Sequence, residues 1–466
     1  MHRSSPSGFF MPRGWGLLAA GAVALLAAAT LGRRDLLALA VLLIGLPVLA
    51  AAMLRFFKPV FEVERTFSPP LVETGTAATV TLRVRGRGQP ASGAAMREGL
   101  PLRFGQSPVF RFPSGYAAEG GASTYEYRLR SSRRGLYRIG PLTAGFVDPF
   151  GLARTVHTLG GADLLAVAPA PVELPASPLF GALGADGSAP SRRRGAPSDD
   201  DATTREYRHG DPMRRVHWAA TARHGELMVR QEEPVTAPTA SILLDERSLS
   251  YGPGSAFAPD GDGTLLTSES FEWAVSAVMS AAVFFSDSGY GVRFVDEMSR
   301  PGLMRSPSAV DAGAAGFRGA DGVQNLAEGL AALGLDPEPS PHPEPAAGRP
   351  APFGEGLLEG LAGGRTPGPL LAVTGRISPA EAAALAPAAR YSPQPLALLV
   401  TDRPAELRPA LKILREAGWH AVAVSPAISL PAAWALLEEE DPQTPHPARP
   451  PARAPGRAAA VVSEHP

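Results

Sequence analysis

The sequence predicts a membrane-anchored protein of several domains: a hairpin of two transmembrane helices, a β-sandwich and then an α/β domain. Three observations predict this order. Two long uncharged apolar stretches lie near the N-terminus, alternation with period two follows them, and short apolar runs then alternate with amphipathic helices. With 466 residues, the chain is also longer than one hydrophobic core usually supports.

The composition excludes several classes of function. The chain has no cysteine, which removes disulfides, thiolate metal ligands and cysteine nucleophiles. Its formal net charge of -1 provides no overall basic field for nucleic acid or acidic lipid. Its two lysines, Lys58 and Lys412, do not follow glycine in a phosphate-loop pattern, so any ATP site must belong to a partner.

The two apolar stretches cover residues 15–31 and 36–54. Each is close to the ~20 residues with which a helix crosses ~30 Å of hydrocarbon. A cleaved signal peptide is the alternative for the first stretch, but the second follows after four residues, which favours a helical hairpin. We therefore predict two transmembrane helices joined by a short turn.

The charges beside this hairpin predict the side of the membrane on which the rest of the chain lies. A hairpin places residues 1–14 and everything after residue 54 on one side of the bilayer. The basic residues are Arg3, Arg13, Arg55 and Lys58 on that side, against Arg33 and Arg34 in the turn. Because cytoplasmic flanks carry the excess of basic residues, we expect the bulk of the chain in the cytoplasm, at the plasma membrane. An extracytoplasmic location is the alternative.

Residues 60–178 show the alternation that is typical of half-buried strands. Leu82 and Val84, for example, alternate with polar residues, and turn signals separate such runs. This pattern predicts a small antiparallel sandwich. Its most distinctive stretch is residues 133–152, RRGLYRIGPLTAGFVDPFGL, which we interpret as a hairpin with a tight turn at Asp148 and no catalytic role.

Strand and helix patterns alternate after a Gly-, Ala-, Ser- and Pro-rich linker at residues 179–204. The expected strands are 241–245, 291–295, 370–374, 396–401 and 421–424, and the expected helices are 268–287, 379–389 and 405–417. Such alternation predicts a parallel sheet covered by helices on both faces. Residues 298–320 and 335–368 are expected to be Gly/Pro-rich insertions, and residues 440–466 a disordered tail.

Residues 205–233, REYRHGDPMRRVHWAATARHGELMVRQEE, form the densest motif of the chain. Its histidines are eight and seven residues apart, which fits neither one helical face nor a familiar zinc pattern. Nearby acids offset its arginines, which argues against a nucleic-acid site. The favoured interpretation is structural: the arginines join the sandwich, the linker and the α/β domain, with Trp218 as a buried anchor.

This motif resembles the signature of the bacterial family known as domain of unknown function 58. The pattern of that family runs roughly Arg-x-Tyr-x-x-Gly-Asp, then Arg-x-[IV]-[HND]-Trp, then Ala-Arg-x-Gly-x-Leu. The matching residues are Arg205, Tyr207, Gly210, Asp211, Arg215, His217, Trp218, Ala222, Arg223, Gly225 and Leu227. The stretches RRGLYRIGP and DPFGL and the N-terminal hairpin also resemble the family, so the similarity extends from about residue 12 to 435.

The resemblance implies a von Willebrand factor A-like, Rossmann-like α/β domain within residues 205–435. It also implies a gene near those of MoxR-type AAA+ ATPases and sometimes of transglutaminase-like membrane proteins. Domains of this type often bind Mg²⁺ through Asp-x-Ser-x-Ser after the first strand. Here Asp245 is followed by Arg247 and Leu249 at the serine positions, and Asp402 lies where a later ligand loop would be. Because an arginine repels a cation, we expect a degenerate site without metal or other cofactor, and we interpret Asp402 as a helix cap.

Two functional hypotheses follow. The first is a non-enzymatic adaptor or assembly factor that binds a protein partner, a MoxR-type AAA+ ATPase, through the α/β domain. Its expected determinants, at the domain junction or the partner surface, are Arg205, Tyr207, Gly210, Asp211, Arg215, His217, Trp218 and Arg223. The second is a cell-envelope enzyme, or an accessory of a transglutaminase-like system, with Asp211, His217 and Glu226 or Glu232 in acid–base roles. An extracytoplasmic location would favour the second.

Overall fold

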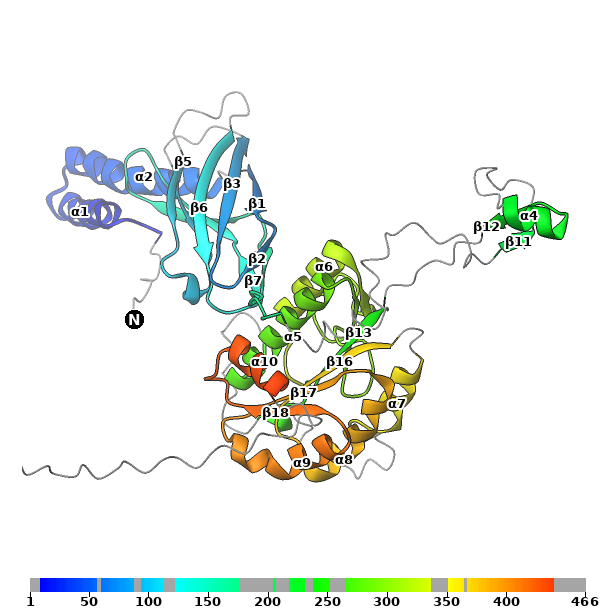
Figure 1. The fold of residues 1–466 in the computed structure, drawn as a ribbon. Helices are drawn as coiled ribbons and strands as arrows, with labels where there is room; N and C mark the ends of the chain where they lie inside the picture. The colour runs from blue at the N-terminus through cyan, green and yellow to red at the C-terminus, as the bar shows by residue number, and fades with distance from the viewer. Residues whose placement is uncertain are drawn as a thin grey trace, which may run out of the picture.

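The computed structural model describes residues 9–56, 60–87, 94–112, 122–176, 204–206, 218–230, 238–251, 265–336, 351–363 and 367–439. They form a helical hairpin, a β-sandwich, a small two-stranded unit and a six-stranded α/β domain (Figure 1). The predicted linker at 179–204 lies outside the described residues except for Thr204. The predicted tail at 440–466 lies outside them as well.

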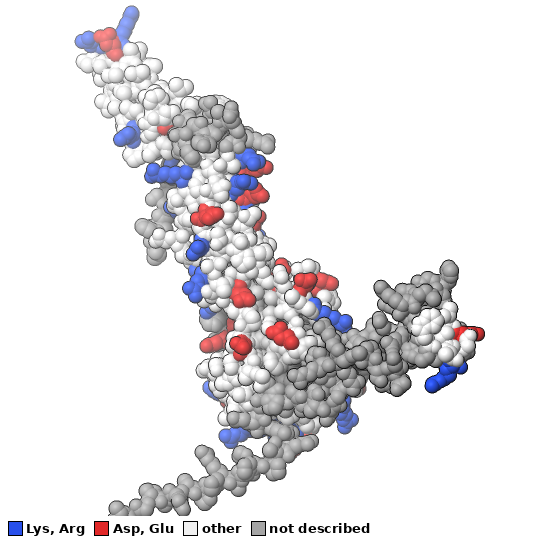
Figure 2. All heavy atoms as spheres, turned by 45° about the horizontal axis from the view of Figure 1, so that its top comes forward, with Lys and Arg blue, Asp and Glu red and all other residues white. Residues whose placement is uncertain are grey.

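Two long apolar helices form the N-terminal hairpin. Helix α1 covers Pro12–Leu31 and α2 covers Arg34–Phe56, and each is long and apolar enough to span a membrane. Gly32 ends α1 in the left-handed conformation, with φ of 63°, and its N–H donates to the carbonyl of Ala28. Figure 2 shows uncharged side chains along the hairpin and charged ones at its tip. Both predicted spans are thus helices. The first begins three residues before the predicted start, and the second extends two residues beyond the prediction at each end.

The sandwich consists of one sheet that faces two others. The first sheet contains β1 (Val60–Ser68), β3 (Ala77–Arg87) and β6 (Ala122–Arg130), in that order. The second contains β5 (Val109–Phe112), β4 (Ala94–Glu98), β8 (Leu142–Val147) and β9 (Arg154–Leu159). The third contains β2 (Leu71–Glu73), β10 (Asp163–Ala168) and β7 (Gly135–Ile139).

Strand β3 connects the two halves of the sandwich core. Its residues Leu82 and Val84 pack against the second sheet, whereas Ala78 and Val80 pack against the third. The predicted alternation is therefore confirmed on this strand. The expectation of a purely antiparallel sandwich is wrong at one place, because β2 and β10 pair in parallel. A strand of three residues is too short for its pairing to be visible in a periodic pattern.

The α/β domain is a sheet in the order β15-β14-β13-β16-β17-β18, in which β15 is antiparallel and the other strands are parallel. Its strands are β13 (Thr239–Leu244), β14 (Gly291–Asp296), β15 (Gly316–Phe317), β16 (Pro367–Thr374), β17 (Pro395–Val400) and β18 (His420–Val424). One face packs against α5 (Glu269–Asp287), α6 (Gly319–Ala331) and α10 (Leu430–Glu439). The other packs against α7 (Glu355–Ala362), α8 (Pro379–Leu385) and α9 (Arg408–Glu416). This confirms a parallel sheet covered on both faces, in a doubly wound order that reverses between β13 and β16.

Three helices of this domain were not expected from the sequence. Helix α7 lies inside the region predicted to be an insertion, α6 begins at the end of the other one, and α10 runs to Glu439, beyond the predicted boundary at 435. In α6 the glycines serve close packing: a Cβ at Gly329 would lie 2.3 Å from Cδ1 of Leu303. A glycine-rich sequence usually indicates a loop, but in α6 it forms a tightly packed helix.

Candidate functional site

The carboxyl ends of β13 and β16 meet where the strand order reverses, the position at which open α/β sheets usually bind ligands. Asp245 follows β13 and is completely buried. The hydroxyl of Ser250 donates to Oδ2 of Asp245 at 2.5 Å, and the N–H of Asp245 donates to the carbonyl of Val373 in β16 at 3.0 Å. A Cβ at Gly375 would lie 2.2 Å from the carbonyl oxygen of Ser250, so this position requires glycine.

Arg247 occupies the place beside Asp245 where a cation would be coordinated. Its Nε and Nη2 donate to Oδ1 and Oδ2 of Asp245, each at 2.8 Å, and its Nη1 pairs with Glu381 in the first turn of α8. Burial alone would lower the pKa of Arg247, but the hydrogen bonds to Asp245 and Glu381 raise it above its usual value. The guanidinium is therefore a permanent positive charge at this edge of the sheet. Among the described residues, no group of three or more His, Cys, Asp or Glu is placed to hold a metal.

Asp402 does not cap a helix. The turn that follows it, Pro404–Leu407, begins after Arg403 and has no side-chain cap. The hydroxyl of Thr401 instead accepts the N–H of Arg403, at 3.3 Å, while Asp402 is exposed. The interpretation of Asp402 as a helix cap is thus wrong, because the preceding threonine accepts the local N–H and the helical turn starts one residue later.

A second carboxylate, Glu246, is buried directly beside Asp245, with 2% of its surface exposed. Nη2 of Arg305 donates to Oε2 of Glu246 at 2.6 Å, and the N–H of Glu246 donates to Oε2 of Glu297 at 3.4 Å. Burial raises the pKa of Glu246 to about 8, against the opposing effect of Arg305 and with a further increase from the charges of Glu297 and Asp296. This end of the sheet therefore contains an acid that is largely protonated at neutral pH.

Glu246→Gln should remove a loss of stability at alkaline pH. An acid with a raised pKa stabilises the fold fully below its unfolded value of 4.5, and this contribution is lost as the pH rises through about 8. Between about pH 5 and pH 9, the wild type should lose about 1–3 kcal/mol more than Glu246→Gln. Chemical unfolding in detergent at several pH values measures the difference, with the exposed Glu416→Gln as control. Parallel pH profiles for wild type and Glu246→Gln would contradict this assignment.

The described part of the 205–233 motif forms a small unit. Strand β11 (Thr204–Glu206) pairs antiparallel with β12 (Met228–Arg230), and α4 (Trp218–His224) precedes β12. The hydroxyl of Thr221 accepts the N–H of Met228 at 3.0 Å, and Gly225, with φ of 79°, follows the helix. Figure 1 draws this signature unit (β11, α4 and β12) apart from the sandwich and from the six-stranded sheet.

The predicted site residues are only partly described. The residues outside the described part are Tyr207, Gly210, Asp211, Arg215, His217 and Glu232. Arg205 lies on β11, and Arg223 and Glu226 are exposed in and after α4. Trp218 is 65% exposed at the start of α4, so its expected role as a buried anchor is wrong. A helix of seven residues and two strands of three residues cannot enclose an indole.

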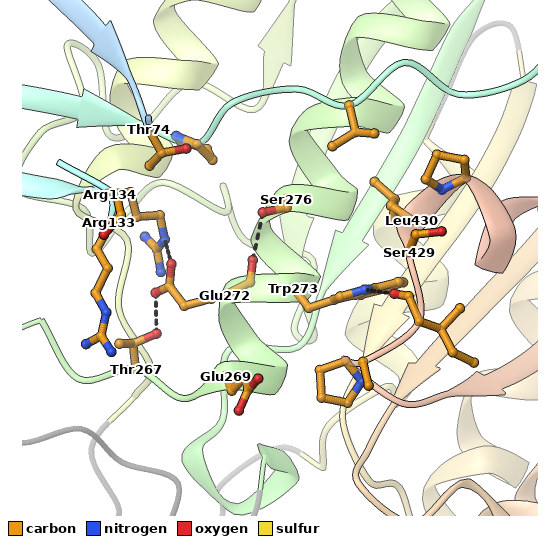
Figure 3. A pocket seen from close by; sticks show the side chains of 17 residues that line it. Thr74, Arg133, Arg134, Thr267, Glu269, Glu272, Trp273, Ser276, Ser429 and Leu430 are labelled. Carbon is orange, nitrogen blue, oxygen red and sulfur yellow. Dashed lines mark hydrogen bonds and ion pairs between the residues drawn. The ribbon is translucent and has the colours of Figure 1, made fainter. Parts of the chain in front are cut away.

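A buried arginine outside the 205–233 motif joins the two large domains. Arg134 lies in the turn between β6 and β7, and 1% of its side chain is exposed. Its Nε donates to Glu272 of α5 at 3.0 Å (Figure 3), and its Nη1 donates to the carbonyls of Leu330 and Leu333 at 2.7 and 2.6 Å. These carbonyls lie at the C-terminal end of α6, where the helix dipole favours a cation. The sandwich thus supplies a junction contact of the kind that we expected from the arginines of the signature.

A cavity of about 760 Å³ lies beside this junction (Figure 3). The turns of the sandwich, the first half of α5 and the loop before α10 line it. The indole N–H of Trp273 in α5 donates to the carbonyl of Ile428 at 2.9 Å, which holds that loop against α5. Ala168 and Leu174, which follow the core of the sandwich in sequence, pack in the core of the α/β domain. The junction therefore combines apolar packing with the Arg134–Glu272 pair.

Residues 203–259 match the model of a family described as "Protein of unknown function DUF58". This match identifies residues 203–259 as a segment similar to the DUF58 family. The matched segment begins at β11 and continues through β13 and the Asp245 loop, so the DUF58 signature connects the signature unit with the Arg247 site. A search of curated proteins matched none of them to this chain.

Three solved structures are weakly similar to this protein. The CARDB domain of the PF1109 protein from Pyrococcus furiosus, in complex with di-metal ions, is 15% identical over 24% of this chain and 87% of that chain, with a TM-score of 0.16. Alkylpurine DNA glycosylase AlkC from Pseudomonas fluorescens, bound to DNA, is 10% identical over 29% and 39%, with a TM-score of 0.17. A β-glucosidase from Listeria innocua is 12% identical over 22% and 16%, with a TM-score of 0.13. Likenesses at these TM-scores carry no argument about fold or function.

Sequence reasoning missed Arg134, Glu272 and Glu381. The available signal for Arg134 was its place in the RRGLYRIGP stretch, which resembles the family. Glu381 follows Ser378 at capping-box spacing, and the structure contains that capping box. Its pairing with Arg247, however, joins residues 134 positions apart and depends on the strand order of the sheet.

Proposed function

We propose that this protein is a membrane-tethered, non-enzymatic adaptor that presents its signature unit to a protein partner. The observation that supports the proposal is the exposure of Trp218, the largest side chain of the signature. Trp and Arg are enriched in the few residues that dominate protein–protein binding, and Arg223 is exposed on the same helix. Of the two roles considered for the signature, partner surface and domain junction, the exposed indole favours the partner surface.

The partner proposed is a MoxR-type AAA+ ATPase. The family association and the lack of a phosphate-loop lysine in this chain both support a partner that supplies ATP hydrolysis. We further propose that the α/β domain is von Willebrand factor A-like, as its strand order and the position of Asp245 after β13 suggest. Because Arg247 already binds both oxygens of Asp245, partner binding by the signature unit is proposed not to require Mg²⁺ at the α/β domain.

The membrane tether is proposed to place both large domains in the cytoplasm. Helices α1 and α2 are long and apolar enough to span a bilayer, and the end of the hairpin near the sandwich carries Arg13 and Arg55. A cytoplasmic location is required for contact with an ATPase. A reporter fused after β1 that proved extracytoplasmic would contradict the proposal.

Affinity purification from detergent-solubilised membranes, followed by mass spectrometry, tests the partnership. The wild type should enrich an AAA+ ATPase, and Trp218→Ala should lose it. Tyr391→Ala, which removes another exposed aromatic side chain from the α/β domain, should retain it. Consistent absence of AAA+ proteins from the wild-type eluate would contradict the ATPase assignment. Enrichment of a transglutaminase-like membrane protein instead would favour the accessory alternative.

A further inference from the structure

The turn at residues 148–152 lies directly against the first turn of α1. The N–H of Met11 donates to the carbonyl of Leu152 at 2.8 Å, and the N–H of Arg154 donates to the carbonyl of Phe9 at 2.8 Å. A Cβ at Gly14 would lie 2.3 Å from the carbonyl oxygen of Leu152. The start of the first apolar helix and this turn of the sandwich are therefore in backbone contact.

Asp148 fixes the shape of the turn. Its carboxylate accepts the N–H groups of Phe150, Leu152 and Ala153 at 2.9, 2.7 and 2.6 Å, and Asp148 itself is buried. Gly151 adopts φ of 67°, which favours glycine at this position. This confirms the tight turn that the sequence predicts. The ring of Phe150 takes no part in these contacts and is 61% exposed.

The length of α1 determines how deep this turn lies. Its 20 residues extend about 30 Å, which equals the hydrocarbon thickness of a bilayer. If α1 spans the membrane, Gly14 in its first turn lies at the membrane–water boundary. Leu152 touches Gly14, and Phe150 is two residues away from Leu152, so its Cα lies within about 7 Å of that of Leu152 at this boundary.

The surroundings of the turn fit a lipid–water interface. Phe9, Trp15 and Phe56 are exposed at this end of the hairpin, at 37%, 60% and 85%. Aromatic side chains concentrate at membrane interfaces because their rings partition into the headgroup region. The exposed arginines near the turn, which can bind lipid phosphates, are Arg13, Arg55 and Arg154. Leu54, near the end of α2, is buried in the core of the sandwich and holds the sandwich against the hairpin (Figure 1).

We infer that the Asp148–Leu152 turn is a third membrane contact, which inserts Phe150 into the lipid–water interface and seats the sandwich on the bilayer. This inference rests on the proposed membrane anchoring by α1 and α2. It goes further, because it assigns one face of the sandwich to lipid and leaves the opposite end, which contains Arg134, facing the α/β domain.

The absence of cysteine makes the inference directly testable in the full chain. Three single-cysteine variants, Phe150→Cys, Leu102→Cys and Val23→Cys, would each be labelled with a small environment-sensitive fluorophore. Leu102 is a matched control, because it is 98% exposed on the sandwich and its neighbour Phe104 packs on Tyr137, near Arg134. Val23 is 69% exposed within α1 and reports on the span itself. The proteins would be reconstituted into phosphatidylcholine–phosphatidylglycerol vesicles that contain nitroxide lipids, labelled either near the headgroup or deep in the acyl chains.

The probe at Phe150 should be blue-shifted and quenched more strongly by the shallow nitroxide than by the deep one. The probe at Leu102 should be quenched by neither, and the probe at Val23 should be quenched by the deep nitroxide. If the probe at Val23 is quenched but the probe at Phe150 is not, the inference is overturned and the membrane anchoring by α1 and α2 stands. An unquenched probe at Val23 would overturn the anchoring and the inference with it. Equal quenching at Phe150 and Leu102 would overturn the assignment of the contact to this turn.

Discussion

Arg134→Ala should destabilise the α/β domain by about 3 kcal/mol, because it leaves a carboxylate and two helix-terminal carbonyls without their partner. Glu272 would lose its hydrogen bond to Nε, and the carbonyls of Leu330 and Leu333 would lose theirs to Nη1. For a domain of this size, the midpoint of thermal unfolding should fall by roughly 6–12 °C. The emission of the buried Trp419 and Trp434 would report this transition in detergent.

Arg133→Ala is the matched control for this prediction. Arg133 is the preceding residue and has the same charge, but its side chain is exposed, so its replacement should change stability by less than about 0.5 kcal/mol. Arg134→Lys should give an intermediate result, because an ammonium keeps the charge but lacks the planar fork of donors. Equal losses in Arg133→Ala and Arg134→Ala would show that the junction does not depend on the buried guanidinium.

Arg247→Ala should cost about 3–5 kcal/mol, because the completely buried carboxyl group of Asp245 would lose its cationic partner. The same change removes the ion pair with Glu381, which connects α8 to the loop after β13. Chemical unfolding, followed by the fluorescence of Trp419, would measure the loss. Arg403→Ala provides the control, since Arg403 pairs with Glu406 at an exposed position and its loss should change stability by less than about 0.5 kcal/mol.

Magnesium should discriminate further between the wild type and Arg247→Ala. Millimolar Mg²⁺ should leave the unfolding midpoint of the wild type unchanged, because the guanidinium already holds both oxygens of Asp245. In Arg247→Ala the carboxylates of Asp245 and Glu381 lose their cationic partner and become available to a hard cation, so Mg²⁺ should raise the midpoint. Stabilisation of the wild type by Mg²⁺ would contradict the view that Arg247 takes the place of a metal.

Local patterns of the sequence determined most of the predicted architecture. The two apolar stretches correctly predicted the helices α1 and α2. A helix that can cross a bilayer needs about 20 apolar residues, and an uninterrupted run of that length is visible in the sequence itself. The strands β13, β14, β16, β17 and β18 were visible as short apolar runs, because a parallel sheet covered on both faces buries most residues of its strands. Helix α6 was missed because the close packing of Gly329 on Leu303 gives the helix a composition typical of loops.

The functional contacts were harder to predict, because they join residues that are distant in sequence. Arg134 and Glu272 are 138 positions apart, and nothing in either local pattern indicates the other. The absence of Asp-x-Ser-x-Ser after β13 predicts a degenerate metal site, and the structure adds that Arg247 pairs with Asp245 and Glu381. For Trp218, a large apolar residue within a dense motif suggested burial, but its short helix and strands provide no core.

A binding titration between the purified full-length protein in nanodiscs and a purified MoxR-type ATPase is the most direct test of the adaptor function. The wild type should bind, and Trp218→Ala should weaken the affinity by about tenfold or more, the effect expected when a binding hot spot is truncated. Tyr391→Ala should bind as the wild type does. No binding by the wild type, or equal affinities for the wild type and Trp218→Ala, would contradict the proposal that the exposed DUF58 signature is the partner surface.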